Sequence, residues 1–433
     1  MRIQSPENTS PIDRVSKEPR ASRLRIGLPL HLPQALTVFR HRNFRLFFFG
    51  QLISVIGSWM QTTALQWLVY SLTNSQSSLG LVTFLNFLPV LLVSLLMGVL
   101  VDRLPKRRIL LFTQSWFMLL AVVLAVLTFS GVITYWMILL LAFMVGIGNA
   151  LDMPARQAFY VDLVDRTELT SAIGLNSALF NAARIVGPAI AGLIVGTIGE
   201  APAFAINAIT FLAVIVALLM MRLNPVEKTI KPQKGLSDLR QGVQYMLHEK
   251  TILGLVVMVA LFSLVGAPYM VLLPVYARDI LMIGAEGYGQ LLSAQGIGAL
   301  LGAFGVIFFG NYQRKGRAVL FSRFLLGIGL IGLAFSRHPL GSMLALVVAG
   351  YGFITQLILT NSLIQFIVPD ELRGRVLSAY TWALGGFFPL GSLLMGVIGD
   401  RISAPSTALL MGFGCVVLTV VNLIVFPGMK KLI

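Results

Sequence analysis

The feature that most constrains this chain is a series of long segments with almost no charged residue. The stretch from Leu79 to Met97, for example, reads LGLVTFLNFLPVLLVSLLM and carries no charge. A helix needs roughly 20 apolar residues to cross the hydrocarbon core of a bilayer, and runs of this length recur throughout the sequence. Lipid offers the backbone no hydrogen-bond partners, so only helices and closed barrels can span it. These runs are too long for barrel strands, so the sequence predicts membrane-spanning helices.

Twelve apolar segments can be marked, and a long polar interruption divides them into two groups of six. The sequence therefore predicts an all-α membrane protein with twelve transmembrane helices in two pseudo-symmetric six-helix bundles. The expected spans are 44–71, 78–101, 109–130, 133–156, 171–197, 201–221, 252–276, 288–310, 318–336, 340–366, 376–400 and 405–426. The expected order of domains is a cytoplasmic arm at 1–43, a bundle at 44–221, a linker at 222–251, a second bundle at 252–427 and a tail at 428–433.

The amount and position of charge agree with a membrane protein. Only 12% of the residues are charged, whereas soluble proteins have about 25%. The net charge of +16 is explained by the excess of basic residues in cytoplasmic loops rather than by nucleic-acid binding. With the N-terminus inside, 28 of the 33 Lys and Arg residues fall on the inner side and only Arg278, Arg337 and Arg401 on the outer side. The remaining two, Arg184 and Arg323, lie within the spans. Both termini are therefore expected in the cytoplasm.

The sequence lacks the signatures of several functional classes. It contains no G-x-x-x-x-G-K-[ST] stretch that would bind ATP phosphates, and no constellation of catalytic side chains. The four histidines lie outside the apolar runs and form no evident metal-binding pattern, and Cys415 is the single cysteine. No cofactor or metal is expected. A chain of two repeated membrane halves without ATP-binding residues is typical of a secondary transporter, not of an enzyme.

The segment GVLVDRLPKRR, residues 98–108, resembles the signature G-x-x-x-D-R-x-G-R-R between the second and third spans of the major facilitator superfamily. The matching residues are Gly98, Asp102, Arg103, Lys106 and Arg107, whereas Pro105 stands where the family has glycine. The resemblance implies two six-helix bundles that alternate access to a central site.

A physical argument assigns this segment to a gating latch. Gly98 lets two helices approach closely, and the Asp102 carboxylate can hold the N-terminus of a helix from the other half through its charge and the helix dipole. The expected partner is the start of the eleventh span, with Arg373 and Arg375. The alternative is that the basic residues only set the membrane topology.

A second resemblance concerns the direction of transport. NAARIVGPAIAG, residues 181–192, is similar to the GPxxGG signature of superfamily exporters, with Gly187, Pro188 and Gly192 matching. Nearly the whole membrane part resembles the enterobactin-exporter branch. This implies a monomer in the bacterial cytoplasmic membrane that exports a siderophore, drug or metabolite in exchange for protons. A lysophospholipid or lipid translocator and a non-transporting sensor remain alternatives.

Two ionisable residues within the spans are candidates for function, because charge inside a membrane is costly, about 2.5–3.5 kcal/mol for Arg on insertion scales. Arg184 lies near the middle of the fifth span and is expected to face a substrate that is anionic, or neutral and aromatic. Asp152 lies about one turn inside the fourth span and is the coupling candidate. The alternatives are a structural ion pair for Arg184 and a salt bridge from Asp152 to Arg156.

The first span carries a polar face, which we expect to line the substrate cavity. Its spacing of three and four residues places much of it on one side of a helix, and a polar stripe in lipid must face a cavity or another helix. Trp382 is a further cavity candidate in the eleventh span. The polar residues are Gln51, Ser54, Ser58, Gln61 and Thr62.

Overall fold

The computed structural model describes residues 36–165, 167–222, 244–309 and 315–426, except for the side chains of residues 94–96, 98, 99, 102, 250, 309 and 371. Every regular element within these ranges is helical. The first half contains η1 (Thr37–Arg40), α2 (Arg42–Thr73), α3 (Gln76–Arg103), α4 (Lys106–Phe129), α5 (Tyr135–Tyr160), α6 (Leu169–Ile198) and α7 (Glu200–Met220). The second half contains α9 (Lys250–Val265), η2 (Ala267–Leu272), α10 (Leu273–Val275), η3 (Tyr276–Ile280), α11 (Gly284–Phe309), α12 (Lys315–Phe335), α13 (Pro339–Ile367), α14 (Asp370–Ile402) and α15 (Ala404–Val425).

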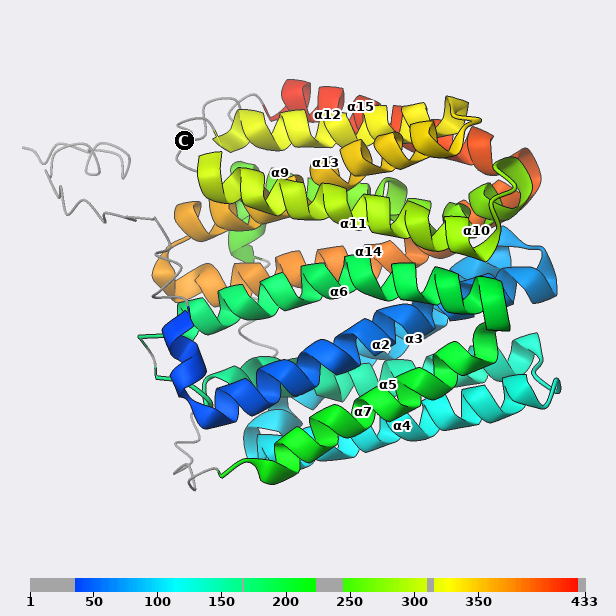
Figure 1. Cartoon of the computed structure of the whole chain (residues 1–433). Helices are drawn as coiled ribbons and strands as arrows, with labels where there is room; N and C mark the ends of the chain where they lie inside the picture. Colours follow the sequence, from blue (N-terminus) through cyan, green and yellow to red (C-terminus); the bar gives the residue numbers. More distant parts are fainter. Residues whose placement is uncertain (1–35, 166, 223–243, 310–314, 427–433) are drawn as a thin grey trace, which may run out of the picture.

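The two halves lie one above the other in Figure 1, with the first half, from blue to green, below and the second half, from light green through yellow to red, above. The helices run roughly parallel or antiparallel. We call the end of the molecule where α2 begins and α15 ends the terminal face, and the opposite end the distal face. The predicted linker, at 222–251, lies mostly outside the described residues, as does most of the N-terminal arm.

Eleven helical segments of the described chain are long and apolar enough to cross a membrane. α2, the first expected span, is not among them, although at about 1.5 Å per residue its 32 residues are long enough. Its polar face lowers its hydropathy, and it packs between α6 and α7 within the bundle. The twelve expected spans therefore correspond to eleven apolar segments and one more polar helix that its neighbours cover.

The seventh expected span is not one regular helix. α9 ends at Val265, and 3-10, α and π turns follow through Ile280. Pro268 and Pro274 lie in this stretch, and proline removes a backbone donor and clashes with the preceding turn. The sequence placed these prolines within the span but did not predict how far the helix would be interrupted.

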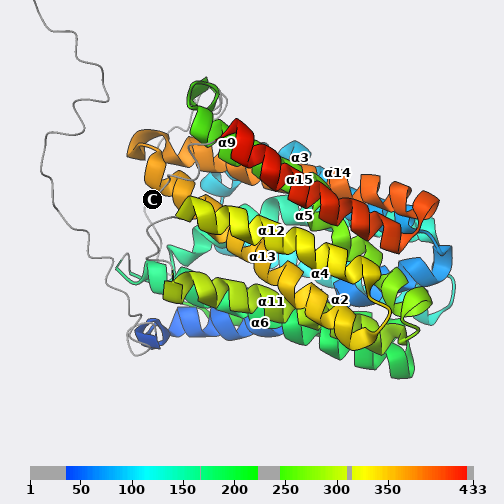
Figure 2. The same cartoon turned by 90° about the horizontal axis from the view of Figure 1, so that it is seen from above.

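The halves touch along two pairs of helices. α3 packs against α14, and α6 packs against α11; Figure 2 shows α6 directly beside α11. The largest buried apolar cluster combines both halves and includes Leu79 at the start of α3, Tyr288 at the start of α11 and Met395 near the end of α14. These positions lie toward the distal face.

Toward the terminal face, each half has its own core. One buried cluster contains residues of the first half only, among them Phe44, Phe47 and Phe159. Another contains residues of the second half only, among them Val319 and Ile364. The described apolar contacts thus join the halves at the distal face and leave them separately packed at the terminal face.

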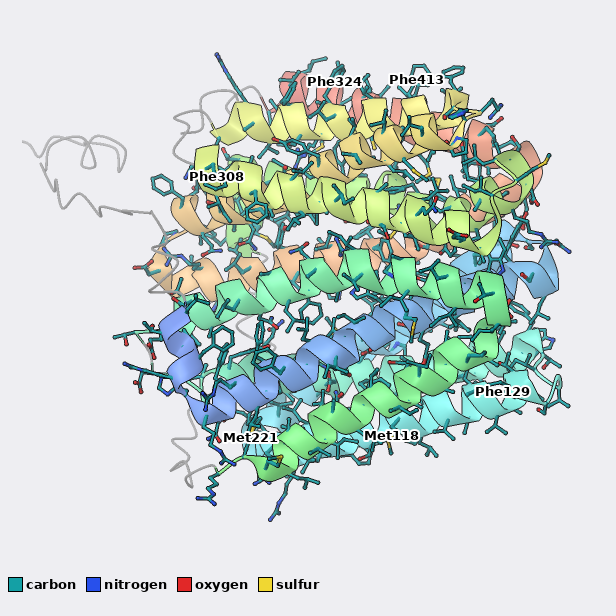
Figure 3. All side chains as sticks on the ribbon, in the orientation of Figure 1. Met118, Phe129, Met221, Phe308, Phe324 and Phe413 are labelled. Carbon is teal, nitrogen blue, oxygen red and sulfur yellow. The ribbon has the colours of Figure 1, made fainter. Side chains whose placement is uncertain are left out.

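Large apolar side chains cover the outside of the bundle. Phe308, Phe324 and Phe413 point outward in Figure 3, and they are 76%, 41% and 54% exposed. Phe129 does the same on the first half. A soluble protein rarely exposes apolar patches of such extent, so this surface fits the hydrocarbon of a bilayer.

Candidate functional site

The predicted latch residues lie at the terminal face. Gly98 and Asp102 belong to the last turns of α3, and their side chains lie outside the described part. Lys106 Nζ donates to both carboxylate oxygens of Asp162 at 2.9 Å. Both residues belong to the first half, so this contact does not join the halves. The latch between the halves therefore stays a prediction.

The other basic latch residues also occupy helix ends. Arg107 donates to the Leu219 carbonyl at 3.0 Å, a contact within the first half. Arg373 forms an ion pair with Asp370 of the same helix, α14. Arg103 lies at the end of α3, and Arg375 lies in the second turn of α14. These contacts of Lys106, Arg107 and Arg373 thus stabilise each half separately.

Asp152 is at the centre of a buried hydrogen-bond network in the first half. Its carboxylate accepts from Thr113 Oγ1 at 2.6 Å and from Gln114 Nε2 at 2.9 Å, both on α4. Arg156, one turn along α5, donates from Nε at 3.1 Å and pairs through Nη2 at 2.5 Å. Arg156 also donates to Gln51 of α2. The salt bridge between Asp152 and Arg156, anticipated as an alternative, is present, and it ties together α2, α4 and α5.

The polar face of α2 mostly contacts other parts of the first half in this conformation. Gln51 and Ser54 are buried, and Gln61 accepts from Asn207 of α7 at 2.7 Å. Ser58 donates to the Ser54 carbonyl, and Thr62 donates to the Ser58 carbonyl. The side chains of Gln51 and Gln61 thus lie in interfaces with other helices, as the alternative to a cavity-facing stripe had it. That the polar face of α2 lines a cavity stays a prediction.

Arg184 lies where the two halves meet. Its guanidinium carbon is 5.1 Å from the centre of the Trp59 ring on α2, a distance at which cation–π attraction acts. The phenol of Tyr269 in the second half lies near Arg184 and beside Gln295 of α11, and a Cβ at Gly296 of α11 would lie 3.3 Å from the Arg184 carbonyl oxygen. Ser293 of α11 donates to the Ile185 carbonyl at 2.8 Å, which brings α11 against this part of α6.

Several polar atoms of this group are buried without a hydrogen-bond partner among the described residues. They are Arg184 Nη1, Tyr269 Oη, and both amide atoms of Gln295. Buried polar groups are normally satisfied, and an unsatisfied one costs about 1–3 kcal/mol. We call Arg184, Trp59, Tyr269 and Gln295 the interface site. It offers cationic and neutral donors, an amide acceptor and an aromatic face to a ligand.

The small residues of the export-type segment allow close contact of α6 with its neighbours. A Cβ at Gly187 would lie 2.6 Å from Trp59 Cβ, and a Cβ at Gly192 would lie 3.0 Å from the Ala285 carbonyl oxygen. From the other side, a Cβ at Gly289 of α11 would lie 2.4 Å from the Pro188 carbonyl oxygen. Gly187 therefore allows α6 to pack closely on α2 within the first half, whereas Pro188 and Gly192 lie in the contact between the halves.

The distal face is joined by polar contacts that cross between the halves. Asp400, near the end of α14, accepts from Ser75 Oγ at 2.7 Å and from the backbone N–H groups of Gln76 and Ser77 at 2.6 and 3.0 Å. Gln76 Nε2 donates to the Gly399 carbonyl at 3.1 Å. Asp400 thus holds the N-terminus of α3, which we call the distal lock.

A second distal contact lies beside the lock. Tyr70, near the end of α2, donates to the Asp279 carboxylate, and Arg278 lies over the Tyr70 ring at 5.5 Å. Trp67 stacks on Tyr288 with ring centres 5.9 Å apart. Aromatic and charged side chains of both halves therefore close this face.

His41, Asp165 and Glu168 gather at the terminal face, close enough for their ligand atoms to meet one ion. Sequence inspection found no such group. Arg40, however, lies 3.3 Å from Glu168 and 3.6 Å from Asp165, and His41 Nε2 is 2.6 Å from Glu168 Oε2. A guanidinium already contacts both carboxylates, so we assign the group to a salt-bridge cluster.

Comparison with known proteins identifies the class of molecule. A family model described as transmembrane secretion effector matches residues 34–431. The chain belongs to this family of the major facilitator superfamily. It is an efflux transporter and a multi-pass membrane protein, not an enzyme, and the resemblance noted in the sequence is confirmed.

The relatives of the transporter cover almost its whole length. The staphyloferrin A transporter of Staphylococcus aureus is 29% identical over 378 residues, which is 87% of this chain and 94% of that protein. The multidrug efflux pump Tap of Mycolicibacterium fortuitum is 26% identical over 400 residues, 89% and 96% of the two chains.

Solved structures confirm the fold of the transporter. The nucleoside transporter NupG superposes with a TM-score of 0.69 at 15% identity, covering 91% of this chain and 99% of that chain. A bacterial homologue of the iron transporter ferroportin, in an inward-facing state, gives 0.68 at 15% identity, with 90% and 99% covered.

Sequence inspection of the transporter missed Asp400, Tyr269 and Gln295. A signal for Asp400 was present: GVLVDR at 98–103 and GVIGDR at 396–401 share the pattern G-V-x-x-D-R. Both hexapeptides end the helices that pack on each other, α3 and α14. No comparable signal marks Tyr269 or Gln295, because only the packing of the second half, with α11 against α6 and η2 against α14, brings them to Arg184.

Trp382 lies away from these contacts. It is 53% exposed on α14 and packs edge-on against Phe387, with ring centres 6.4 Å apart. A role in binding substrate stays a prediction.

Proposed function

We propose that the transporter exports a small anionic molecule that carries planar oxygen groups or an aromatic ring, of which a siderophore is the leading example. The observation that carries this proposal is the interface site, with Arg184 at its centre. Its donors and its aromatic face are supplied by both halves, so a ligand held there would contact both. The name of the staphyloferrin A transporter, a relative along nearly the whole chain, supports the same substrate class.

The charge of the site favours an anion. No carboxylate among the described residues forms an ion pair with Arg184, and its Nη1 atom has no partner. Asp152 is the one buried carboxylate in the described chain, and Arg156 already balances it. A cationic drug would therefore find no free acidic partner in these positions, whereas an anion would find a guanidinium with its planar set of donors.

We place the terminal face in the cytoplasm of a bacterium, with both termini inside its cytoplasmic membrane. The support is the division of Lys and Arg, 28 inner against three outer. The described state would then be closed on the outer side and joined there by the distal lock. A substrate would reach the interface site from the cytoplasm, which is the direction an exporter requires.

Release to the outside requires the distal contacts to open and the terminal face to close. The two G-V-x-x-D-R segments suggest how these states alternate. Asp400 at the end of α14 holds the start of α3 in the described state. We infer that Asp102 at the end of α3 holds the start of α14 in the other state. Only one of these two acid-to-helix contacts would form at a time.

We propose that protons drive this cycle and that Asp152 is the coupling group. Protonation of its carboxylate would weaken the salt bridge to Arg156, and Arg156 also holds Gln51 of α2. A proton would thereby loosen the contact of α2 with α5. The site is complete within one chain, so a monomer is the expected functional unit.

The proposal is tested by transport into proteoliposomes with an imposed proton gradient, screened with siderophores, cationic drugs, macrolides and lysolipids. We expect an anionic siderophore to be transported best. Arg184→Lys keeps the charge but loses the fork of donors, so it should weaken binding about tenfold, and Arg184→Gln should weaken it further.

Arg317→Gln, which removes an exposed arginine at the start of α12, is the matched control and should behave as the wild type. Normal binding and transport by Arg184→Gln would show that Arg184 has no role in substrate recognition. Transport of macrolides or cationic drugs alone would assign the multidrug function that the names of other relatives carry. Transport of lysolipids alone would assign the lipid alternative.

A further inference from the structure

A second buried guanidinium lies inside the second half, away from the interface site. Arg323 of α12 has no exposed surface and is among the largest fully buried side chains. Its Nε donates to Gln356 Oε1 of α13 at 3.1 Å. Its guanidinium carbon, Cζ, lies 5.1 Å from the centre of the Phe262 ring of α9. The side chain is thus held firmly by two helices.

The donors of Arg323 are only partly used. Nη1 and Nη2 are both buried without a hydrogen-bond partner, and no carboxylate among the described residues pairs with this guanidinium. Thr360, one helical turn beyond Gln356 on the same face of α13, has a buried Oγ1 that also lacks a partner. An unpaired charge in the membrane interior is costly and usually has a function.

The first half shows how such a position is balanced. Gln114 follows the first residue of α4, Lys106, by eight positions, and Arg323 follows the first residue of α12, Lys315, by the same number. Gln114 donates to a carboxylate on the next helix, Asp152, whereas Arg323 donates to a neutral amide on the next helix. The corresponding position in the second half therefore carries a positive charge without a protein counter-charge.

We propose that Arg323, Gln356 and Thr360 form a binding site for a small oxyanion, of the carboxylate class, within the second half. Two adjacent N–H donors of one guanidinium match the two oxygens of a carboxylate. Gln356 fixes the plane of the guanidinium through Nε and leaves the Nη atoms for the ligand. Because Arg323 is completely covered, the site takes a small group rather than a large ligand. The proposal does not depend on the substrate of the interface site.

The test uses the purified full chain in detergent, with the ionic strength held constant by chloride and formate as the probe. A ligand that binds the folded state raises the unfolding midpoint with its concentration. We expect a saturable rise for the wild type. Arg323→Gln should raise the apparent Kd for formate about tenfold or more, because charge-assisted hydrogen bonds are lost, and Arg323→Lys should raise it less.

A second variant provides an independent test of the site if Arg323→Gln folds poorly. Gln356→Glu places a carboxylate beside the guanidinium, as Asp152 does in the first half, so it should raise the midpoint without formate and remove the response to formate. Arg317→Gln, which removes an exposed arginine at the start of the same helix, is the matched control and should keep the response.

Two results would overturn the proposal. One is a wild type that does not respond to formate, and the other is a response that persists unchanged in Arg323→Gln. Benzoate in place of formate tests the size of the anion that the site admits. A response to formate alone is expected, because the covered site admits only a small anion, and an equal response to benzoate would contradict this size limit.

Discussion

Replacing Asp400 by Asn is expected to open the distal face. In the described state this carboxylate accepts hydrogen bonds from Ser75 Oγ and from the backbone N–H groups of Gln76 and Ser77. These are the first N–H groups of α3, which have no partner within the helix. An asparagine has nearly the same shape, but it is neutral and presents one oxygen instead of two.

The size of the effect follows from these contacts. A hydrogen bond to a charged group is worth about 1.5–3 kcal/mol, and a negative charge at a helix N-terminus about 0.3–1 kcal/mol. Asp400 is exposed, and the asparagine oxygen retains one bond, so we expect a net loss of about 1–2 kcal/mol. Since 1.4 kcal/mol is tenfold in an equilibrium constant, the balance should shift about 5- to 30-fold toward the outward-open state.

Spin labels report this shift directly. Ser130 directly follows α4 and His338 directly precedes α13 at the distal face, one in each half, and both are exposed. Cysteines at these positions, in a Cys415→Ala background because Cys415 is the single native cysteine, allow the distance between the halves to be measured. The wild type should show one short distance, and Asp400→Asn should add a longer population.

The matched control is Glu200→Gln, which removes an acid from the first turn of α7 on the same face. It should leave the distances unchanged, because α7 lies within the first half. An unchanged distance distribution in Asp400→Asn would refute the distal lock.

Asp102→Asn, which removes the inferred latch of the other state, should shift the balance in the opposite direction and slow turnover.

Three further predictions concern other parts of the transporter. Gly289→Ala puts a Cβ 2.4 Å from the Pro188 carbonyl oxygen; this overpacking, typically about 1–3 kcal/mol, should push α6 from α11 and lengthen the distance between the same spin labels. Asp152→Asn leaves the partly buried charge of Arg156 without its carboxylate partner; we expect proton-driven transport to be lost while substrate exchange without a gradient continues, and normal proton-driven rates would contradict the coupling role. The hydrogen bond from His41 holds the pKa of Glu168 below its ordinary value, so the attachment of η1 contributes at neutral pH and is lost as the pH falls through the lowered pKa. Hydrogen exchange in Thr37–Arg40 should therefore rise in acid, and Glu168→Gln should raise it already at neutral pH.

The membrane helices could be read from the sequence because their signal is local. A run such as 78–101 is apolar along its whole length, and the observed helix, Gln76–Arg103, differs by two residues at each end. The seventh span was less well predicted, because proline shows where a helix can break but not how the chain continues beyond it. Packing against α14 and α11 determines that course.

The candidate site was only partly predictable. The sequence marked Arg184 and Asp152, because a charge within an apolar run is conspicuous. It also placed Gln51 and Gln61 on one side of α2, but periodicity shows the direction of a side chain and not what lies opposite. The structure places Arg156 and Asn207 there.

The sequence by itself determined that this chain spans a membrane, that it has two halves, and that it belongs to the major facilitator superfamily. These properties depend on hydropathy and on short motifs, which act over neighbouring residues. Only the tertiary structure decided that Tyr269 and Gln295 join Arg184, that Arg323 has donors without a counter-charge, and that Asp400 holds the start of α3. These contacts join residues from about 33 to more than 300 positions apart, because the helices bring them together in space, and no local pattern records which helices become neighbours.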